Sequence, residues 1–181
     1  MDFDKDLQSI QEVRWLVAKA VVAQKELAKM SQQQVDGIAK AIADACAAQS
    51  ERLAKMAVEE TGFGIWQDKV LKNLLGSAIT WDSVKDMKTV GIIKDDRQNG
   101  LMEVGVPMGV VAALIPSTNP TSTTMYKSII SIKAGNAIVS RWMMIRKNHK
   151  RKSTCCRKKI RSHKGAAVLL HGRLTGTSTA S

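Results

Sequence analysis

Residues 109–139 constrain the fold more than any other part of the chain. They read GVVAALIPSTNPTSTTMYKSIISIKAGNAIV: an apolar run, a polar loop, a helix-like stretch and, after a tight turn, a second apolar run. The first run, residues 109–115, is apolar at odd and even positions alike, which is typical of a strand covered on both faces of a parallel sheet. Because strand, loop, helix and strand make a βαβ unit, the segment predicts the opening of a doubly wound α/β fold.

The chain before this segment is predicted to be helical. Apolar residues recur at helical spacing across residues 7–27 with charged residues between them, so we expect a long amphipathic helix that ends near Met30. Ser31 then stands three residues before Gln34, which is the spacing of a capping box. This pair predicts the start of a second helix.

Two further helices and a hairpin are expected before the βαβ unit. Ser50 is a candidate cap for a third helix, which should end at Gly62 and Gly64. Apolar residues across residues 66–81 predict a fourth helix. The runs TVGIIKDD and LMEVGVP are rich in β-formers and are separated by DRQNG, so they are expected to pair as a hairpin.

The positive charge of the chain is confined to its last part. The formal net charge is +12, yet residues 1–139 hold 16 basic and 16 acidic side chains, whereas residues 140–181 hold 12 basic and no acidic ones. A dense cationic surface would suggest a nucleic-acid or anionic membrane partner, but here it belongs to the tail alone. We therefore divide the chain into a folded part, residues 1–139, and a basic tail, residues 140–181.

The cysteines and histidines predict neither a disulfide framework nor a metal site. Three cysteines are too few for a framework, so a reducing, cytoplasmic setting is expected. Cys46 falls on the apolar face of the second predicted helix, which indicates a buried structural thiol. The remaining cysteines and the histidines match no common zinc spacing; they are Cys155, Cys156, His149, His163 and His171. No apolar run approaches the roughly 20 residues that a membrane span requires, so no membrane insertion is predicted.

The loop IPSTNP, residues 115–120, is the candidate functional site. It follows the first predicted strand of the βαβ unit, and ligands of open α/β sheets bind at the carboxyl ends of strands. The phosphate-binding pattern GxGxxG is absent. The alternative is an ordinary helix cap, with Ser117, Thr118 or Asn119 accepting backbone hydrogen bonds and Pro120 at the first helical position.

Several motifs in a fixed order carry a resemblance to a known family. They are AVEETGFGIWQDKVLKN at residues 57–73, then KTVGII, then VPMGVVAALIPSTNPTSTTMYKSIISIKAGNAIV. Together they resemble the CoA-acylating aldehyde dehydrogenases, the acetaldehyde and propionaldehyde dehydrogenases of bacterial fermentation and microcompartments, over roughly residues 5–139. The resemblance implies a helical first half that leads into the start of a Rossmann-like cofactor-binding domain, truncated in this chain.

The resemblance also implies a chemistry. In that family a cysteine thiolate attacks an aldehyde, hydride passes to NAD, and the acyl group moves from cysteine to coenzyme A. Asn119 resembles the oxyanion-hole donor, and losing one such donor typically costs about 2.7–4 kcal/mol of transition-state stabilisation. Ile115, Pro116, Ser117 and Thr118 would then line the nicotinamide side of the cleft.

Two departures from the family predict that this chain is inactive alone. In the family, the second strand of the βαβ unit runs into a segment resembling FSPHP that helps hold the adenosine end of the cofactor, whereas here Val139 is followed by SRWMMIRKNHKRK. The family's nucleophilic cysteine lies in a separate domain beyond residue 181. Cys155 and Cys156 have cationic neighbours but are expected to lack the rigid surroundings that catalysis needs.

Three explanations of residues 140–181 are open. The tail could be a nucleic-acid-binding arm, with its cations on phosphates and Trp142 stacked on a base. It could be an ordinary disordered, solvated tail. We favour a third explanation, a shift of the coding frame near Val139, because acidic residues vanish and the family match stops at the same place.

The leading interpretation is therefore a piece of an NAD-dependent, CoA-acylating aldehyde dehydrogenase. A second reading is an interaction protein whose amphipathic helices, within residues 4–84, associate with full-length partners or a microcompartment shell. The expected partners are a small aldehyde and CoA in the full-length family, and further copies of the chain or a microcompartment shell. The third reading is a nucleic-acid-binding module acting through the tail. The expected location is the cytoplasm or a bacterial microcompartment.

Overall fold

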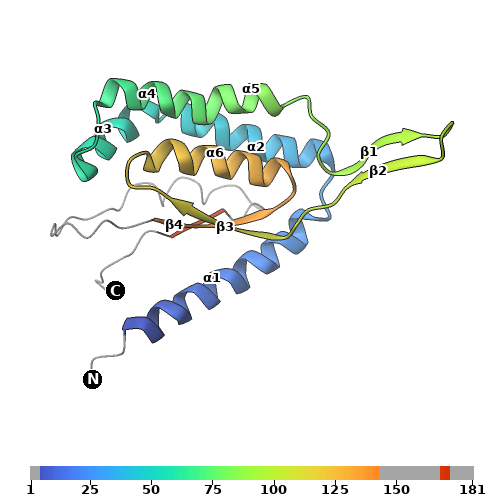
Figure 1. Cartoon of the computed structure of the whole chain (residues 1–181), viewed down its shortest axis with the longest axis horizontal. Helices are drawn as coiled ribbons and strands as arrows, with labels where there is room; N and C mark the ends of the chain where they lie inside the picture. Colours follow the sequence, from blue (N-terminus) through green and yellow to red (C-terminus); the bar gives the residue numbers. More distant parts are fainter. Residues whose placement is uncertain (1–4, 143–167, 172–181) are drawn as a thin grey trace, which may run out of the picture.

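The computed structural model describes residues 5–142 and 168–171. Figure 1 shows a layer of helices, the strands β3 and β4 beneath it, a long helix α1 on the other side of these strands, and a hairpin that projects sideways. The helices are α1 Lys5–Leu27, α2 Gln32–Ala47, α3 Ser50–Thr61, α4 Trp66–Leu74, the π-helix η1 Leu75–Ile79, α5 Thr80–Val84 and α6 Pro120–Lys133. The strands are β1 Gly91–Asp96, β2 Leu101–Gly105, β3 Val110–Ile115, β4 Ala137–Trp142 and β5 Val168–His171.

The first helical boundaries follow the capping signals of the sequence. Helix α1 ends at Leu27, three residues before the predicted end. Ser31 caps α2 as predicted: its Oγ accepts from the Gln34 amide at 3.3 Å, and its own amide donates to Gln34 Oε1 at 2.9 Å. Both groups of the capping box are therefore satisfied, which confirms the prediction.

Helix α3 ends as predicted but begins differently. Gly62 takes the left-handed conformation, with φ of 70°, and its amide donates to the Val58 carbonyl. Ser50 is the first residue of the helix rather than its cap, because Gln49 occupies the capping position and makes no side-chain capping bond. The proposed cap at Ser50 was wrong.

The predicted fourth helix is a continuous run of α4, η1 and α5 that reaches Val84. Its middle, η1, is a π-helical turn. A Cβ on Gly76 in this turn would lie 2.6 Å from the Ser122 carbonyl oxygen in α6. Glycine therefore allows η1 to approach the backbone of α6 more closely than any other residue could.

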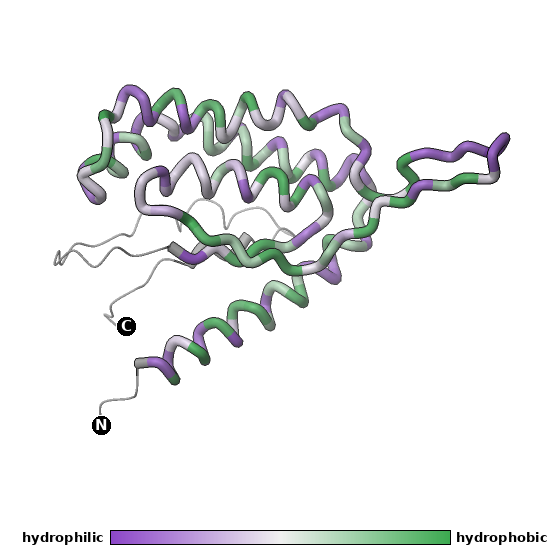
Figure 2. Tube along the Cα trace, in the orientation of Figure 1, coloured by the Kyte–Doolittle hydropathy of each residue, from purple (hydrophilic) through white to green (hydrophobic). Residues whose placement is uncertain are grey.

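The strands pair as the sequence predicts. β1 and β2 form an antiparallel hairpin, and Figure 2 shows apolar stretches on its arms and a hydrophilic tip. β3 and β4 are parallel with α6 as the crossover between them, which confirms the βαβ unit. β5 pairs parallel to the other edge of β4, giving the order β3-β4-β5.

The tail predictions remain untested for most of residues 140–181. Residues 140–142 extend β4, and Val168–His171 forms β5. Cys155, Cys156, His149 and His163 lie outside the described residues. The proposed boundary at residue 139 and the explanations of the tail therefore stay predictions.

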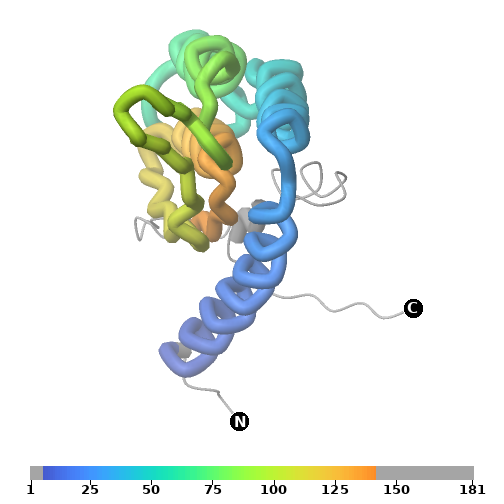
Figure 3. The backbone as a smooth tube through the Cα atoms, turned by 90° about the vertical axis from the view of Figure 1, so that its right-hand side faces the viewer, coloured from blue at the N-terminus to red at the C-terminus, as the bar shows by residue number. Residues whose placement is uncertain are grey.

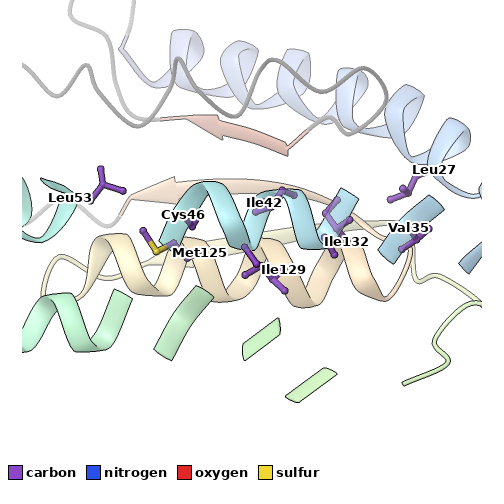
Figure 4. Close-up of a cluster of buried hydrophobic side chains, with 10 residues drawn as sticks. Leu27, Val35, Ile42, Cys46, Leu53, Met125, Ile129 and Ile132 are labelled. Atoms are coloured by element: carbon purple, nitrogen blue, oxygen red, sulfur yellow. The ribbon is translucent and has the colours of Figure 1, made fainter. Parts of the chain in front are cut away.

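The main core lies between α2 and α6, with contributions from α1 and α3. Figure 4 shows apolar side chains from these helices pointing toward one another. Ile129 is fully buried here, and Cys46 is 8% exposed, which confirms the prediction of a buried thiol. The buried members of this cluster are Leu27, Val35, Ala39, Ile42, Ala43, Cys46, Leu53, Met125, Ile129 and Ile132.

The two faces of β3 differ in burial. Ala113 and Ile115 are buried, whereas Leu114 between them is 63% exposed. The prediction that both faces of this strand are covered is wrong at Leu114. Helix α1 contacts β4 and β3, but Figure 3 shows that most of its length extends away from the rest of the molecule. The outer face of β3 is therefore only partly covered by the described residues.

Candidate functional site

The candidate site is the loop between β3 and α6. It leaves the carboxyl end of β3 after Ile115 and enters α6 at Pro120. Pro116, Ser117 and Asn119 are half-buried and Thr118 is exposed, whereas Ile115 is fully buried. Of the four residues predicted to line a cofactor cleft, Ile115 thus presents no side-chain surface to solvent.

Asn119 stands at the capping position of α6 without using its side chain as a cap. Its backbone carbonyl accepts from the Thr123 amide at 3.3 Å, and Pro120 is the first helical residue, as predicted. Its side chain makes no capping hydrogen bond, and its backbone has φ of −136° and ψ of 62°. The alternative of an ordinary cap by Asn119 was therefore wrong, and the Asn119 amide is free of that structural task.

Two lysines of α4 reach this loop. Lys69 Nζ donates to the Thr118 carbonyl at 2.7 Å, and Lys72 Nζ donates to Asn119 Oδ1 at 3.4 Å. Lys69 is only 5% exposed, and burial lowers its pKa, with the charge of Lys72 adding to the effect. The loop thus accepts hydrogen bonds from two neighbouring ammonium groups, one buried and one exposed.

A third residue of α4 holds the first turn of α6. Asn73 is completely buried, and its Oδ1 accepts from Thr121 Oγ1 at 2.7 Å. Its Nδ2 donates to the Ser50 carbonyl at 2.8 Å, and its own carbonyl accepts from Ser77 Oγ at 2.6 Å. Both polar ends of this buried amide are therefore paired, which links α3, α4 and α6.

Sequence reasoning had not assigned roles to these α4 residues. Lys69, Lys72 and Asn73 have the spacing i, i+3 and i+4, which places them on one face of a helix. The signal was present in the motif DKVLKN, which contributed to the family resemblance without a physical reason. The structure supplies that reason, because this face touches residues 118–121.

The ETGFG motif forms the turn that leads into α4. Gly62 and Gly64 both have positive φ, near 70°. A Cβ on Gly64 would lie 3.8 Å from Lys69 Cε, so this turn runs beside the buried lysine stem. Within the same motif, burial raises the pKa of Glu60, and the neighbouring Glu59 raises it further. The motif thus packs next to the residues that hold the loop.

The described residues supply an amide and two ammonium groups here, but no thiol. Cys46 lies in the core between α2 and α6 rather than at the loop. In the part of the chain that the structure describes, no three His, Cys, Asp or Glu side chains gather as a metal site. Among these same residues, no helix has both the length and the apolar character of a membrane span. Within the described residues, the chemistry that this loop and its neighbours offer is therefore hydrogen-bond donation.

Comparisons with known proteins agree on one family. The model of the aldehyde dehydrogenase family matches residues 6–143. A solved structure of a probable aldehyde dehydrogenase from Listeria monocytogenes EGD-e is 64% identical, with a TM-score of 0.76 over 78% of this chain. An acetylating aldehyde dehydrogenase from Geobacillus thermoglucosidasius is 52% identical, with a TM-score of 0.75 over 77% of this chain.

A curated relative gives the same picture. The succinate-semialdehyde dehydrogenase (acetylating) of Clostridium kluyveri is 46% identical over 127 residues, which are 70% of this chain. The match covers 28% of that enzyme, and the two solved structures are each covered over 31% of their length. The chain therefore spans less than a third of the relatives that it matches.

Proposed function

Because this chain belongs to the aldehyde dehydrogenase family, we propose that it is the N-terminal part of a CoA-acylating member. The proposed overall reaction converts an aldehyde, CoA and NAD to an acyl-CoA and NADH. The acetylating relatives support this subclass, since two of the three similar proteins described above carry that activity in their names. On this proposal, the 181-residue chain is inactive alone, because its described site contains no thiol.

The observation that carries the proposal is the position of the Asn119 side-chain amide. It stands at the carboxyl end of β3, it does not cap α6, and its oxygen faces Lys72. When a thiolate adds to an aldehyde carbonyl, negative charge develops on the carbonyl oxygen, and an N–H donor fixed in advance stabilises it. An amide is suited to this task because it donates a hydrogen bond at any physiological pH without losing a proton.

The fit of the nicotinamide cofactor is partial within the described residues. When bound, NAD would accept the hydride from the aldehyde carbon. Pro116, Ser117 and Thr118 have surface that could contact the nicotinamide side, whereas Ile115 is fully buried and could contribute only support from beneath. The adenosine end would require the segment after β4, which lies outside the described residues.

Activity in a restored enzyme tests this proposal. Residues 1–139 would replace the matching part of the Listeria relative, and aldehyde-dependent and CoA-dependent NADH formation would be followed. We expect Asn119→Ala to lower kcat about 10²- to 10³-fold, as is typical for an oxyanion-hole donor. Asn99→Ala is the matched control, because Asn99 lies in the distant hairpin turn. Full turnover by the Asn119→Ala protein would overturn the proposed role.

Two tests concern the chain as it is encoded. The purified 181-residue protein should form no NADH from aldehyde, CoA and NAD. Translation of the parent DNA in the other two frames past codon 139 should show an SPHP-like strand and a downstream cysteine-bearing domain. Their absence from both frames would refute the frameshift explanation. Association with a shell or with further copies, and nucleic-acid binding, stay predictions from the sequence.

A further inference from the structure

We propose that Lys72 is a positioning residue that sets the direction of the Asn119 side-chain amide. The proposal rests on the proposed function, because it concerns the amide assigned there as the oxyanion donor. The α4 face formed by Lys69, Lys72 and Asn73 would hold residues 118–121 for this purpose.

The chemistry of the contact selects one orientation of the amide. An ammonium group has three donors and no acceptor, whereas a carboxamide has an acceptor oxygen at one end and an NH₂ donor at the other. Only Oδ1 of Asn119 can therefore face Lys72 Nζ, which lies 3.4 Å away. This leaves Nδ2 on the opposite side. The cation also draws electron density toward Oδ1, which makes the NH₂ group a better donor.

The backbone on both sides of Asn119 is anchored from the same helix face. Before it, the Thr118 carbonyl accepts from buried Lys69 at 2.7 Å. After it, the Thr121 hydroxyl donates to buried Asn73 at 2.7 Å. These anchors fix the position of the Asn119 backbone, while Lys72, between Lys69 and Asn73 on the helix, acts on the side chain. The three contacts together leave the amide little freedom.

The cost of this arrangement argues against a purely structural role for Lys72. Lys69 and Lys72 are like charges three residues apart on one helix, and such pairs are destabilising. In agreement, the charge of Lys72 contributes to lowering the pKa of Lys69. Lys72 is exposed, and its one described hydrogen bond, to Asn119, is long, so the contact contributes little to folding. A lysine at this place is better explained by what it does to the amide.

NMR spectroscopy of the full 181-residue chain tests the orientation directly. The side-chain ¹³Cγ and ¹⁵Nδ2 signals of Asn119 would be assigned by their loss in Asn119→Ala. We expect Lys72→Met to shift both signals, because Oδ1 loses its donor. Lys72→Arg should leave both signals close to their positions in the unaltered chain, because arginine also donates. Lys40→Met, which removes an exposed lysine of α2, is the control and should leave both signals in place. The thermal midpoint should change little in these lysine variants, because each lysine is exposed.

Two outcomes would overturn the proposal. Asn119 signals that are the same in Lys72→Met as in the unaltered chain would show that Lys72 does not orient the amide. A shift accompanied by a clear loss of thermal stability, with no recovery in Lys72→Arg, would show that Lys72 only supports the fold. Neither result would bear on whether Asn119 acts as the oxyanion donor.

Kinetics in the restored enzyme separate this proposal from the proposed function. Lys72→Met should lower kcat about tenfold with little change in KM, because a misaligned donor stabilises the transition state less while substrate binding is little affected. Added to Asn119→Ala, it should cause no further loss, since the two residues act as a unit. An unaltered kcat for Lys72→Met alone, beside a large loss for Asn119→Ala, would refute the positioning role and keep the function. Full activity of Asn119→Ala would refute the function while the NMR result stands.

Discussion

The interface between α2 and α6 and the outer face of β3 contain the same kinds of apolar side chain, yet they differ in what covers them. Ile129 in the interface is fully buried, whereas Leu114 on β3 is 63% exposed. The interface between α2 and α6 is filled by side chains from helices of the same chain, although Leu71, Leu75 and Ile79 on the outer side of the α4–η1 run are each more than half exposed. The outer face of β3 needs a partner that the described residues only partly supply.

The β1–β2 hairpin and the segment after it belong with the uncovered region. Ile92, Leu101 and Val104 are each more than half exposed, and Met108 is 91% exposed. Figure 1 shows the hairpin projecting from the helical layer. The comparison teaches that an apolar pattern predicts which face seeks burial but not whether the covering element lies in the same segment of chain.

Truncating one isoleucine and one leucine would test the comparison most strongly. We expect Ile129→Ala to lower the free energy of unfolding by about 3–4 kcal/mol, because it leaves a cavity between α2 and α6. Leu114→Ala removes a largely exposed side chain, so its cost should be below about 1 kcal/mol. Urea denaturation followed by circular dichroism would measure both. Equal costs would mean that the outer face of β3 is covered in solution.

Ion pairs offer a second comparison of buried and exposed regions. Lys133 is 2% exposed, and its Nζ donates to Asp36 Oδ1 at 2.6 Å and to the Lys85 carbonyl at 3.0 Å. Asp36→Ala should cost about 3 kcal/mol of unfolding free energy, because it leaves a buried ammonium without its counter-charge. Asp44→Ala breaks the exposed pair with Lys40 and should cost less than about 0.5 kcal/mol. Similar urea midpoints for the two variants would contradict this.

Gly76 and Gly37, which both lie inside described helical segments, give a third, smaller contrast. Gly76→Ala should lower the unfolding free energy by about 1–3 kcal/mol, because the new Cβ would meet the Ser122 carbonyl oxygen at 2.6 Å. Gly37→Ala in α2 meets nothing within 4 Å and should instead raise the unfolding free energy by about 0.5–1 kcal/mol. Thermal unfolding would show the opposite signs. A stabilising Gly76→Ala would mean that η1 and α6 are less closely packed than described.

The smallest expected effect is a pH dependence from Lys69. Its pKa is lowered in the folded state, so between that value and the unfolded pKa of 10.5 the unfolded chain binds more protons than the folded chain. Stability due to this group therefore rises with pH in that window. Urea denaturation from neutral pH to about pH 10 should show a less positive slope for Lys69→Met than for the unaltered chain. Equal slopes would indicate that the Lys69 ammonium is well solvated.

The sequence predicted local features better than contacts between distant segments. The capping box of α2 was predictable because Ser31 and Gln34 are three residues apart and satisfy each other. The hydrogen bond from Lys72 to Asn119 was not, because it joins residues 47 positions apart. The exposure of Leu114 was not predictable either, since the sequence pattern of an apolar strand is the same whether or not the element that covers it is present.

The place of the candidate site was predictable, but its supports were not. A polar loop after an apolar strand is enough to place Asn119 at the carboxyl edge of a sheet. Nothing local indicates that its side chain leaves α6 uncapped or that α4 supplies the hydrogen bonds to the loop. The motif DKVLKN drew attention to these residues, but only the fold brings them next to residues 118–121.

The π-turn η1 allows one continuous helix to hold both ends of α6. In a regular α-helix each residue turns the chain by about 100°, and a π-helical turn contains one residue more than an α-helical turn. The part before it, α4, presents Asn73 to Thr121 at the start of α6, while beyond it Trp81 and the Lys85 carbonyl meet Lys133 at the end. Deleting one residue from Leu75–Ile79 would close η1 to a regular α-helical turn, so the stability of that variant would show whether α6 needs the wider turn to keep both of its end contacts.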